Sequence, residues 1–117
     1  ALLSKKGTAT IATGETTVKV KGKGKGGRNQ EVVLSASIFI KNGVVVSCSS
    51  DGVDFITDAA GGIVDGDTKD RAKKLGLNAK DFLDKNDSYN FLRKVNGVIV
   101  TGKTHTNVGD LFVVLGG

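Results

Sequence analysis

Cysteine and histidine are almost absent from this chain of 117 residues, in which Cys48 and His105 are the only residues of their types. One cysteine cannot form an internal disulfide, and its position in the apolar run 44–49 predicts a small buried strand residue. A lone histidine in a loop is more often a bystander than a base. The sequence therefore offers no Ser/His/Asp set for nucleophilic catalysis and no Cys/His set for zinc.

Long hydrophobic runs are absent as well. No apolar run approaches the length of about 20 residues that spans a bilayer, and the opening ALLSKKG lacks the ordered charged and apolar regions of a signal peptide. We therefore expect a cytoplasmic protein with no membrane partner. The chain begins at Ala1 and contains no methionine, so we expect residues 1–117 to be one domain of a longer polypeptide. This length fits a single hydrophobic core.

Aromatic residues are scarce: there are five Phe and one Tyr, and none lies in the lysine-rich stretch 19–28. Single-stranded nucleic acid is held by stacking on aromatic rings, so we expect no nucleic-acid partner despite the net charge of +5. Residues 1–50 carry eight Lys or Arg against two Glu, whereas residues 51–67 carry five Asp and no basic residue. A basic and an acidic loop in one small domain suggest a site for phosphate with a metal ion, although charge alone would favour two solvated loops.

Strands and helices alternate along the chain. β-branched residues predict strands at 8–13 and 16–21, and apolar runs predict buried strands at 43–49 and 98–101 and a last strand at 111–115. Apolar spacing predicts a helix over 29–40 and three short helices at 67–75, 79–85 and 87–95, the last two with caps Asn78 and Asn86. The predicted fold class is α/β, in three layers, with a mixed β-sheet flanked by helices.

Two nucleotide-binding motifs match the sequence but fail on context. The stretch GKGKGG at residues 22–27 fits the dinucleotide fingerprint, yet the strand predicted before it alternates polar and apolar residues, whereas such a sheet begins with an apolar strand. Residues 97–104, GVIVTGKT, fit the P-loop expression, but the residues that should wrap phosphate are the strand-forming Val, Ile, Val and Thr. We interpret both matches as coincidental.

The glycine-rich loop nevertheless predicts an anion site. A loop of this kind that enters a helix presents free N–H groups and the positive end of the helix dipole. Arg28, one residue before the predicted helix, is best placed for a bidentate grip on a phosphate or carboxylate. The other candidate phosphate-binding residues here are Gly24, Lys25, Gly26, Gly27 and Asn29. A flexible surface loop is the alternative, and it explains the lysines well but the glycines poorly.

Polar residues follow the other buried strands. Asp51 and Asp58 come after the strand 43–49, and either carboxylate could hold Mg²⁺ or accept a proton from a hydroxyl. Asp54 in the same segment is interpreted as a turn residue. Candidates for hydrogen bonds to phosphate or sugar oxygens are Thr101, Thr104 and Asn107, although such residues equally form turns.

Several sequence blocks, in order along the chain, resemble the MOFRL domain. They are GETTV at 14–18, GKGKGGRNQE at 22–31, SDG at 50–52, TDAAG at 57–61, NDSY at 86–89, and TG at 101–102 with Thr104, TNV at 106–108 and DL at 110–111. The resemblance covers essentially the whole chain and is far more specific than either nucleotide motif. Ser50, Phe55-Ile56, Lys103 and His105 depart from the residues usual in the family, which bears on loop geometry.

The MOFRL domain is the C-terminal domain of glycerate 2-kinases, a group also labelled hydroxypyruvate reductases. The resemblance implies transfer of the γ-phosphoryl group of ATP to the 2-hydroxyl of D-glycerate, giving 2-phosphoglycerate, with Mg²⁺ and in a cleft shared with an N-terminal domain that this chain lacks. Arg28 matches the family's active-site arginine, and Asp51 and Asp58 complete the predicted catalytic set, one of them as the metal contact. Positioned positive charge suits phosphoryl transfer.

Other interpretations stay open at the level of sequence. The isolated chain is expected to be inactive as a kinase, because the N-terminal domain supplies further catalytic residues in the family. The alternatives are a phosphate- or nucleotide-binding module without catalysis and a hydroxypyruvate reductase. The sequence also leaves open whether position 2 or 3 of glycerate is phosphorylated and which nucleotide is preferred.

Overall fold

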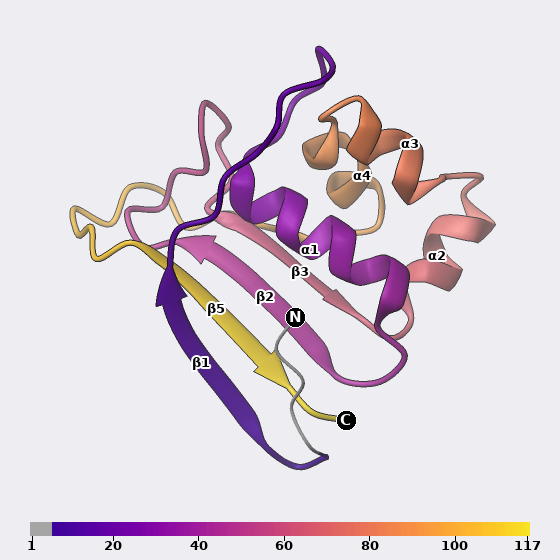
Figure 1. Cartoon of the computed structure of the whole chain (residues 1–117), viewed down its shortest axis with the longest axis horizontal. Coiled ribbons are helices and arrows are strands. Elements are labelled where there is room, and N and C mark those ends of the chain that lie inside the picture. Colours follow the sequence, from indigo (N-terminus) through magenta and orange to yellow (C-terminus); the bar gives the residue numbers. More distant parts are fainter. Residues whose placement is uncertain (1–5) are drawn as a thin grey trace.

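A five-stranded sheet forms the frame of the molecule (Figure 1). The structure, a computed structural model, describes residues 6–117. In sheet order, the strands are β1 (Ala9–Gly14), β5 (Asp110–Leu115), β2 (Val44–Ser49), β3 (Gly61–Asp65) and β4 (Val98–Ile99). Each strand runs antiparallel to its neighbours.

The α/β class is confirmed, but the prediction of a mixed sheet was wrong. β1 and β2 point the same way, as in a strand–helix–strand unit, yet β5 lies between them and runs opposite to both. β3 separates β2 from β4 in the same manner. The sheet is therefore antiparallel throughout, because an opposite strand is inserted between each pair of parallel ones.

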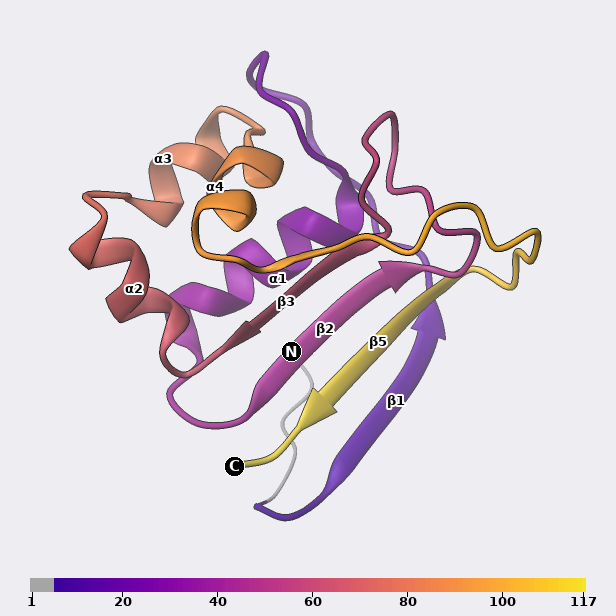
Figure 2. The same cartoon turned by 180° about the vertical axis from the view of Figure 1, so that it is seen from behind.

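All four helices of residues 6–117 lie on one face of the sheet, so this part of the chain has two layers rather than the predicted three (Figures 1 and 2). The helices are α1 (Arg28–Phe39), α2 (Thr68–Lys74), α3 (Ala79–Asp84) and α4 (Ser88–Lys94). α1 packs on β2 and β3, and the three shorter helices contact α1. No helix among residues 6–117 is long and apolar enough to cross a membrane.

The opposite face of the sheet carries β-branched side chains that none of the described helices covers. A row across four strands is set by the register and consists of Ile11, Val113, Val46 and Ile63. Ile11 is 71% exposed. The apolar run in β2 was predicted to be buried on both sides, but Val44 and Val46 on this uncovered face are only half-buried.

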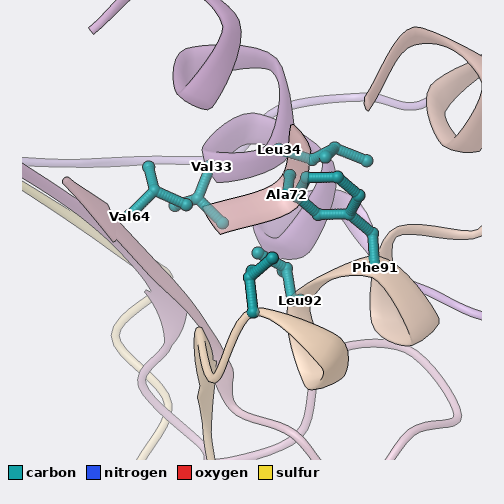
Figure 3. Close-up of a cluster of buried hydrophobic side chains, with 7 residues drawn as sticks. Val33, Leu34, Val64, Ala72, Phe91 and Leu92 are labelled. Carbon is teal, nitrogen blue, oxygen red and sulfur yellow. The ribbon is translucent and has the colours of Figure 1, made fainter. Parts of the chain in front are cut away.

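The hydrophobic core lies between α1 and the short helices and continues to β3 (Figure 3). Its fully buried members include Val33 and Leu34 from α1 and Phe91 and Leu92 from α4. Burial of one such side chain contributes roughly 1.5–3 kcal/mol. The apolar spacing correctly predicted a helix here, but it marked the core face only in part, since Val33 is buried whereas Phe39, on the same predicted face, is 77% exposed.

Of the predicted strands and helix caps, some were confirmed and others were wrong. Residues 16–21 form no strand; they belong to an extended segment, residues 15–27, which we call the arm. Asn78 caps α3 as predicted, accepting the Lys80 N–H over 3.0 Å. Asn86 does not cap α4, because its side chain accepts the N–H groups of Lys21 and Gly22 in the arm.

Candidate functional site

Three loops and the start of α1 meet at one end of the sheet, which we call the site end. β1 and β2 finish there and β5 begins there. Figures 1 and 2 show the arm, the loop 50–60 and the loop 100–109 projecting from this end. The two loops are joined directly, since the Thr104 N–H donates to the Asp51 carbonyl over 3.1 Å. The topology therefore gathers the basic and the acidic segments of the sequence.

Arg28, the first residue of α1, directs its guanidinium at two carboxylates. Its Nε donates to Oδ2 of Asp110 over 2.5 Å and its Nη2 donates to Oδ1 over 3.0 Å, a bidentate pair. Its Nη1 lies 3.2 Å from Oε1 of Glu15. The hydrogen bond to Asp110 raises the pKa of the Arg28 guanidinium, and the side chain is 37% exposed. Arg28 is therefore a fixed cation with part of its surface open to solvent.

A carboxylate of the protein itself occupies the N-terminus of α1. The buried Asp54 accepts the backbone N–H groups of Asn29 and Gln30 over 3.2 and 3.0 Å, and the side-chain amides of the same residues over 3.2 and 2.9 Å. A Cβ on Gly27 would overlap this carboxylate. The expectation of free N–H groups for a phosphate was wrong at Asn29 and Gln30, because the loop 50–60 supplies the anion that the helix end favours.

The glycine-rich part of the arm packs against the connection between α3 and α4. The Gly22 N–H donates to Oδ1 of Asn86 and the Gly24 N–H donates to the Lys85 carbonyl, both over 2.8 Å. A Cβ on either glycine would overlap atoms of Lys85 or Asp87. The glycines are thus explained by close approach of two chain segments, which the sequence analysis did not consider.

The arm and the loop 50–60 also contact α4 through Tyr89. Nζ of Lys25 lies 4.3 Å from the centre of the Tyr89 ring, and the Lys25 carbonyl accepts the Tyr89 N–H over 2.8 Å. A hydrogen bond with Asp58 raises the pKa of the Tyr89 hydroxyl. Lys25, a predicted phosphate ligand, and Asp58, a predicted catalytic residue, therefore have their contacts with α4 rather than with Arg28.

Asp51 lies at the site end and is held by its own loop. Ser49 Oγ and the Val53 N–H both donate to its Oδ1, over 2.6 and 2.9 Å. These hydrogen bonds, with a smaller contribution from the charge of Arg28, lower the pKa of the Asp51 carboxyl. Asp51 is thus an ionised carboxylate within electrostatic reach of Arg28.

The loop 100–109 adds hydroxyl and amide groups at the site end. Thr104 Oγ1 donates to the Ser50 carbonyl over 2.5 Å, beside Asp51. Thr101 and Asn107 make local turn contacts, with the next carbonyl and with the N–H two residues on, respectively. All three predicted residues are exposed. Of the three, Thr104 is the one that hydrogen-bonds to Asp51, through its backbone N–H.

Asn29 lies away from solvent, whereas the sequence analysis predicted that it binds phosphate. Its side chain is fully buried. Its Nδ2 donates to Asp54, and its Oδ1 accepts the Ser47 hydroxyl over 2.7 Å. The amide therefore joins α1 to the loop 50–60 and to β2, and it has no exposed atom for a ligand.

Glu15 and Asp110 were given no role by the sequence analysis, and Asp54 was interpreted only as a turn residue. The sequence does place Glu15 and Asp110 beside the ends of predicted strands. Arg28 and Asp110 are 82 positions apart, however, so their pairing depends on the strand order and could not be predicted from the sequence. Among residues 6–117 there is no group of three or more His, Cys, Asp or Glu side chains that could hold a metal ion by themselves.

A groove of about 1320 Å³ runs between α1 and β5 and reaches Arg28. Its walls are mainly apolar and include Val32 and Phe39 from α1 and Phe112 and Val114 from β5. Glu31 also lines it. Burial raises the pKa of the Glu31 carboxyl, against the opposing effect of a hydrogen bond from Asn86.

Comparison with known proteins gives consistent matches over nearly the whole chain. The sequence profile of the MOFRL family matches residues 8–110. The D-glycerate 2-kinase of Thermotoga maritima is 51% identical over 114 residues, covering 95% of this chain and 27% of that enzyme. The glycerate 2-kinase of Pyrococcus horikoshii is 45% identical over 105 residues, covering 87% of this chain and 24% of that enzyme.

The fold is shared with a solved structure as well. The crystal structure of a glycerate kinase from Thermotoga maritima superimposes with a TM-score of 0.88 at 50% identity, over 92% of this chain and 27% of that one. This chain thus spans about a quarter of the length of the relatives it matches.

Proposed function

This chain belongs to the MOFRL family, and from that premise we propose that it is the C-terminal domain of a glycerate 2-kinase. In this proposal, residues 1–117 form one side of an interdomain site in which D-glycerate is phosphorylated to 2-phosphoglycerate. ATP is the phosphoryl donor. The hydroxyl oxygen at C2 forms a bond to the γ-phosphorus, the bond from that phosphorus to the β,γ-bridging oxygen breaks, and the hydroxyl proton leaves to a base.

The observation that carries the proposal is the half-exposed, doubly anchored guanidinium of Arg28 at the site end. Phosphoryl transfer depends on positioned positive charge around the migrating group more than on a protein nucleophile. A planar fork of N–H groups matches a carboxylate or phosphate with two parallel hydrogen bonds. We assign Arg28 to the carboxylate of glycerate or to the transferred phosphate.

Asp51 is our first choice for the contact with Mg²⁺ or with the reacting hydroxyl, ahead of Asp58. It is ionised and lies within electrostatic reach of Arg28, whereas Asp58 bonds with Tyr89. Both hydrogen bonds to Asp51 fall on Oδ1, so we assign Oδ2 to the cation. Mg²⁺ is commonly bound by one or two carboxylates together with water and nucleotide phosphates, which fits a site with a single carboxylate. The bound ion would neutralise charge on the phosphates.

The loops around Arg28 complete our assignment of this half of the site. Thr101, Thr104 and Asn107 are exposed and suit hydrogen bonds to phosphate oxygens. Gly24, Gly26 and Gly27 support the site by holding the arm in place, and Lys25 stays a peripheral cation beside Tyr89. We propose that an N-terminal domain supplies the remaining catalytic groups in the cytoplasm, so this chain alone is inactive as a kinase.

The test is ADP release from ATP and D-glycerate by the complete polypeptide that carries this chain. Arg28→Ala should reduce kcat/KM by about 10²–10³-fold, as expected when one donor to the transition state is lost. Lys23→Ala, which removes an exposed lysine of the arm, is the matched control and should change little. Thermal melting of each variant checks the fold.

Two outcomes would contradict the proposal. Equal rates for the wild type and a folded Arg28→Ala variant would remove Arg28 from the reaction. NADH oxidation with hydroxypyruvate, in the absence of ADP release, would favour the reductase. Phosphorus NMR of the product distinguishes 2-phosphoglycerate from 3-phosphoglycerate.

A further inference from the structure

The two carboxylates on Arg28 differ sharply in how firmly they are fixed. Asp110 is fully buried, opens β5, and lies in register between Gly14 of β1 and Ser49 of β2. A buried carboxylate is stable only when its charge is paired, and the bidentate contact with Arg28 provides that pair. Asp110 therefore fixes the plane of the guanidinium through two strand pairings.

Glu15 is held far less firmly. It is the first residue of the arm, directly after β1, and its side chain is 70% exposed. Its single contact in this cluster is the one from Oε1 to Nη1 of Arg28 at 3.2 Å. Exposed ion pairs of this kind are weak, since water competes for both partners. Glu15 can therefore leave while Asp110 stays.

The position of Glu15 is the one that an incoming ligand needs. Asp110 takes Nε and one N–H of Nη2, so the remaining exposed edge of the guanidinium is formed by Nη1 and the second N–H of Nη2. Glu15 places a carboxylate against this edge. Chemically, that carboxylate stands where the oxygens of a bound carboxylate or phosphate would stand.

We propose that Asp110 is the positioning residue of Arg28 and that Glu15 is a resident carboxylate which an anionic ligand displaces from Nη1. The inference rests on the proposed role of Arg28 and adds that Glu15 controls the access of anions to its guanidinium. The ligand class is a carboxylate or a phosphate, the two anionic groups of glycerate kinase chemistry. Glu15 keeps the arginine paired until an anionic ligand arrives and takes its place.

The carboxylates around Arg28 oppose the binding of a further anion. Arg28 faces Asp110, Glu15 and, at longer range, Asp51 and Asp54, so these residues together have no surplus of positive charge. An anion can bind well only when a carboxylate withdraws. Neutralising Glu15 should therefore strengthen anion binding, although it removes an interaction of the arginine.

The experiment follows the side-chain Nε–H signal of Arg28 by NMR in the 117-residue chain while inorganic phosphate is added. A second titration uses D-glycerate instead. Glu15→Gln should tighten phosphate binding by about threefold, the size expected for loss of an exposed ion-pair competitor. Asp70→Asn, the same charge change on the exposed surface of α2, is the control and should leave affinity unchanged. The anion whose titration shifts the Arg28 signal identifies the ligand group.

Asp110→Asn tests the positioning role. It should weaken phosphate binding, and in the double variant Glu15→Gln should no longer raise the affinity. That coupling is a readout which a purely structural role of Asp110 would not move. A melting curve checks the fold of Asp110→Asn. If that variant unfolds, Asp110→Glu, which keeps the charge but displaces the carboxylate, replaces it and should weaken phosphate binding in the same way.

Unchanged or weaker binding in Glu15→Gln would overturn the displacement model, and a full Glu15 effect in folded Asp110→Asn would overturn the positioning role. These readouts need no catalysis. If they hold while Arg28→Ala leaves ADP release unaffected, the proposed role of Arg28 in phosphoryl transfer fails, whereas the displacement of Glu15 by an anion stands.

Discussion

Two carboxyl groups near the site end have their pKa values moved in opposite directions by their surroundings. At Asp51, hydrogen bonds from Ser49 and Val53 favour the ionised form. At Glu31 on α1, partial burial along the groove favours the neutral form. The sign of each shift decides how each group affects stability as the pH changes.

Glu31→Gln should stabilise the chain at neutral pH but not in acid. In the folded chain the pKa of Glu31 is raised above its ordinary value of 4.5. The stability that Glu31 contributes is therefore fully present below that value and is lost as the pH rises through the folded pKa. Glutamine keeps the oxygen that accepts from Asn86 without the buried charge. Melting temperatures of both proteins across this pH range give the answer; a difference independent of pH would contradict the assignment.

At the scale of elements, the arm and the α3–α4 connection behave as one unit. The Asn86 side chain bonds to two parts of the chain: in the arm to the Lys21 and Gly22 N–H groups and the Lys19 carbonyl, and in α1 to the Glu31 carboxylate. Its φ of +54° is a strained value for a residue with a side chain. Such a conformation persists because the contacts around it determine it.

Gly24→Ala should destabilise the chain by about 1–3 kcal/mol, the usual cost of forcing an atom into filled space. The new Cβ would overlap Asp87, so the arm or the start of α4 must shift. Gly14→Ala is the matched control, since its Cβ would meet only Phe112 at an ordinary 3.7 Å. Urea unfolding of both variants measures the difference, and equal midpoints would show that the arm is not tightly packed.

The sequence predicted the elements better than the contacts of their ends. α1 follows from apolar spacing and the α3 cap follows from Asn78, both local signals. The roles of Asp54 and Asn86 are not local: each caps or bonds a segment far away in the sequence. The prediction of a site near Arg28 came from residue type and position, and the acidic partners of Arg28 could not be predicted without the fold.

At the scale of the whole molecule, the two faces of the sheet are unequal. The helix-covered face meets the core, whereas the row containing Ile11 and Val46 is uncovered. The sequence could not reveal this asymmetry, because Val and Ile occupy both faces of β2 and β3. Strand order decides which face receives the helices.

Leu34→Ala should cost about 2–5 kcal/mol of unfolding free energy, as for other deletions in a closely packed core. Leu34 is fully buried on α1. Ile11→Thr, on the uncovered face, keeps a β-branched side chain and should change stability by less than about 0.5 kcal/mol. Chemical denaturation compares the two, and a large effect at Ile11 would mean that this face is buried in solution.

The place of β5 in the sheet also governs the order in which the molecule can fold. The last strand in the sequence is the partner of both β1 and β2, so the sheet stays open until the C-terminal residues are available. Contacts between such distant residues slow folding, because a long chain segment must be closed first. Asp110 opens that strand. Arg28 consequently cannot acquire its fixed orientation before Asp110 has been synthesised, so the geometry of the site depends on nearly the whole length of this chain.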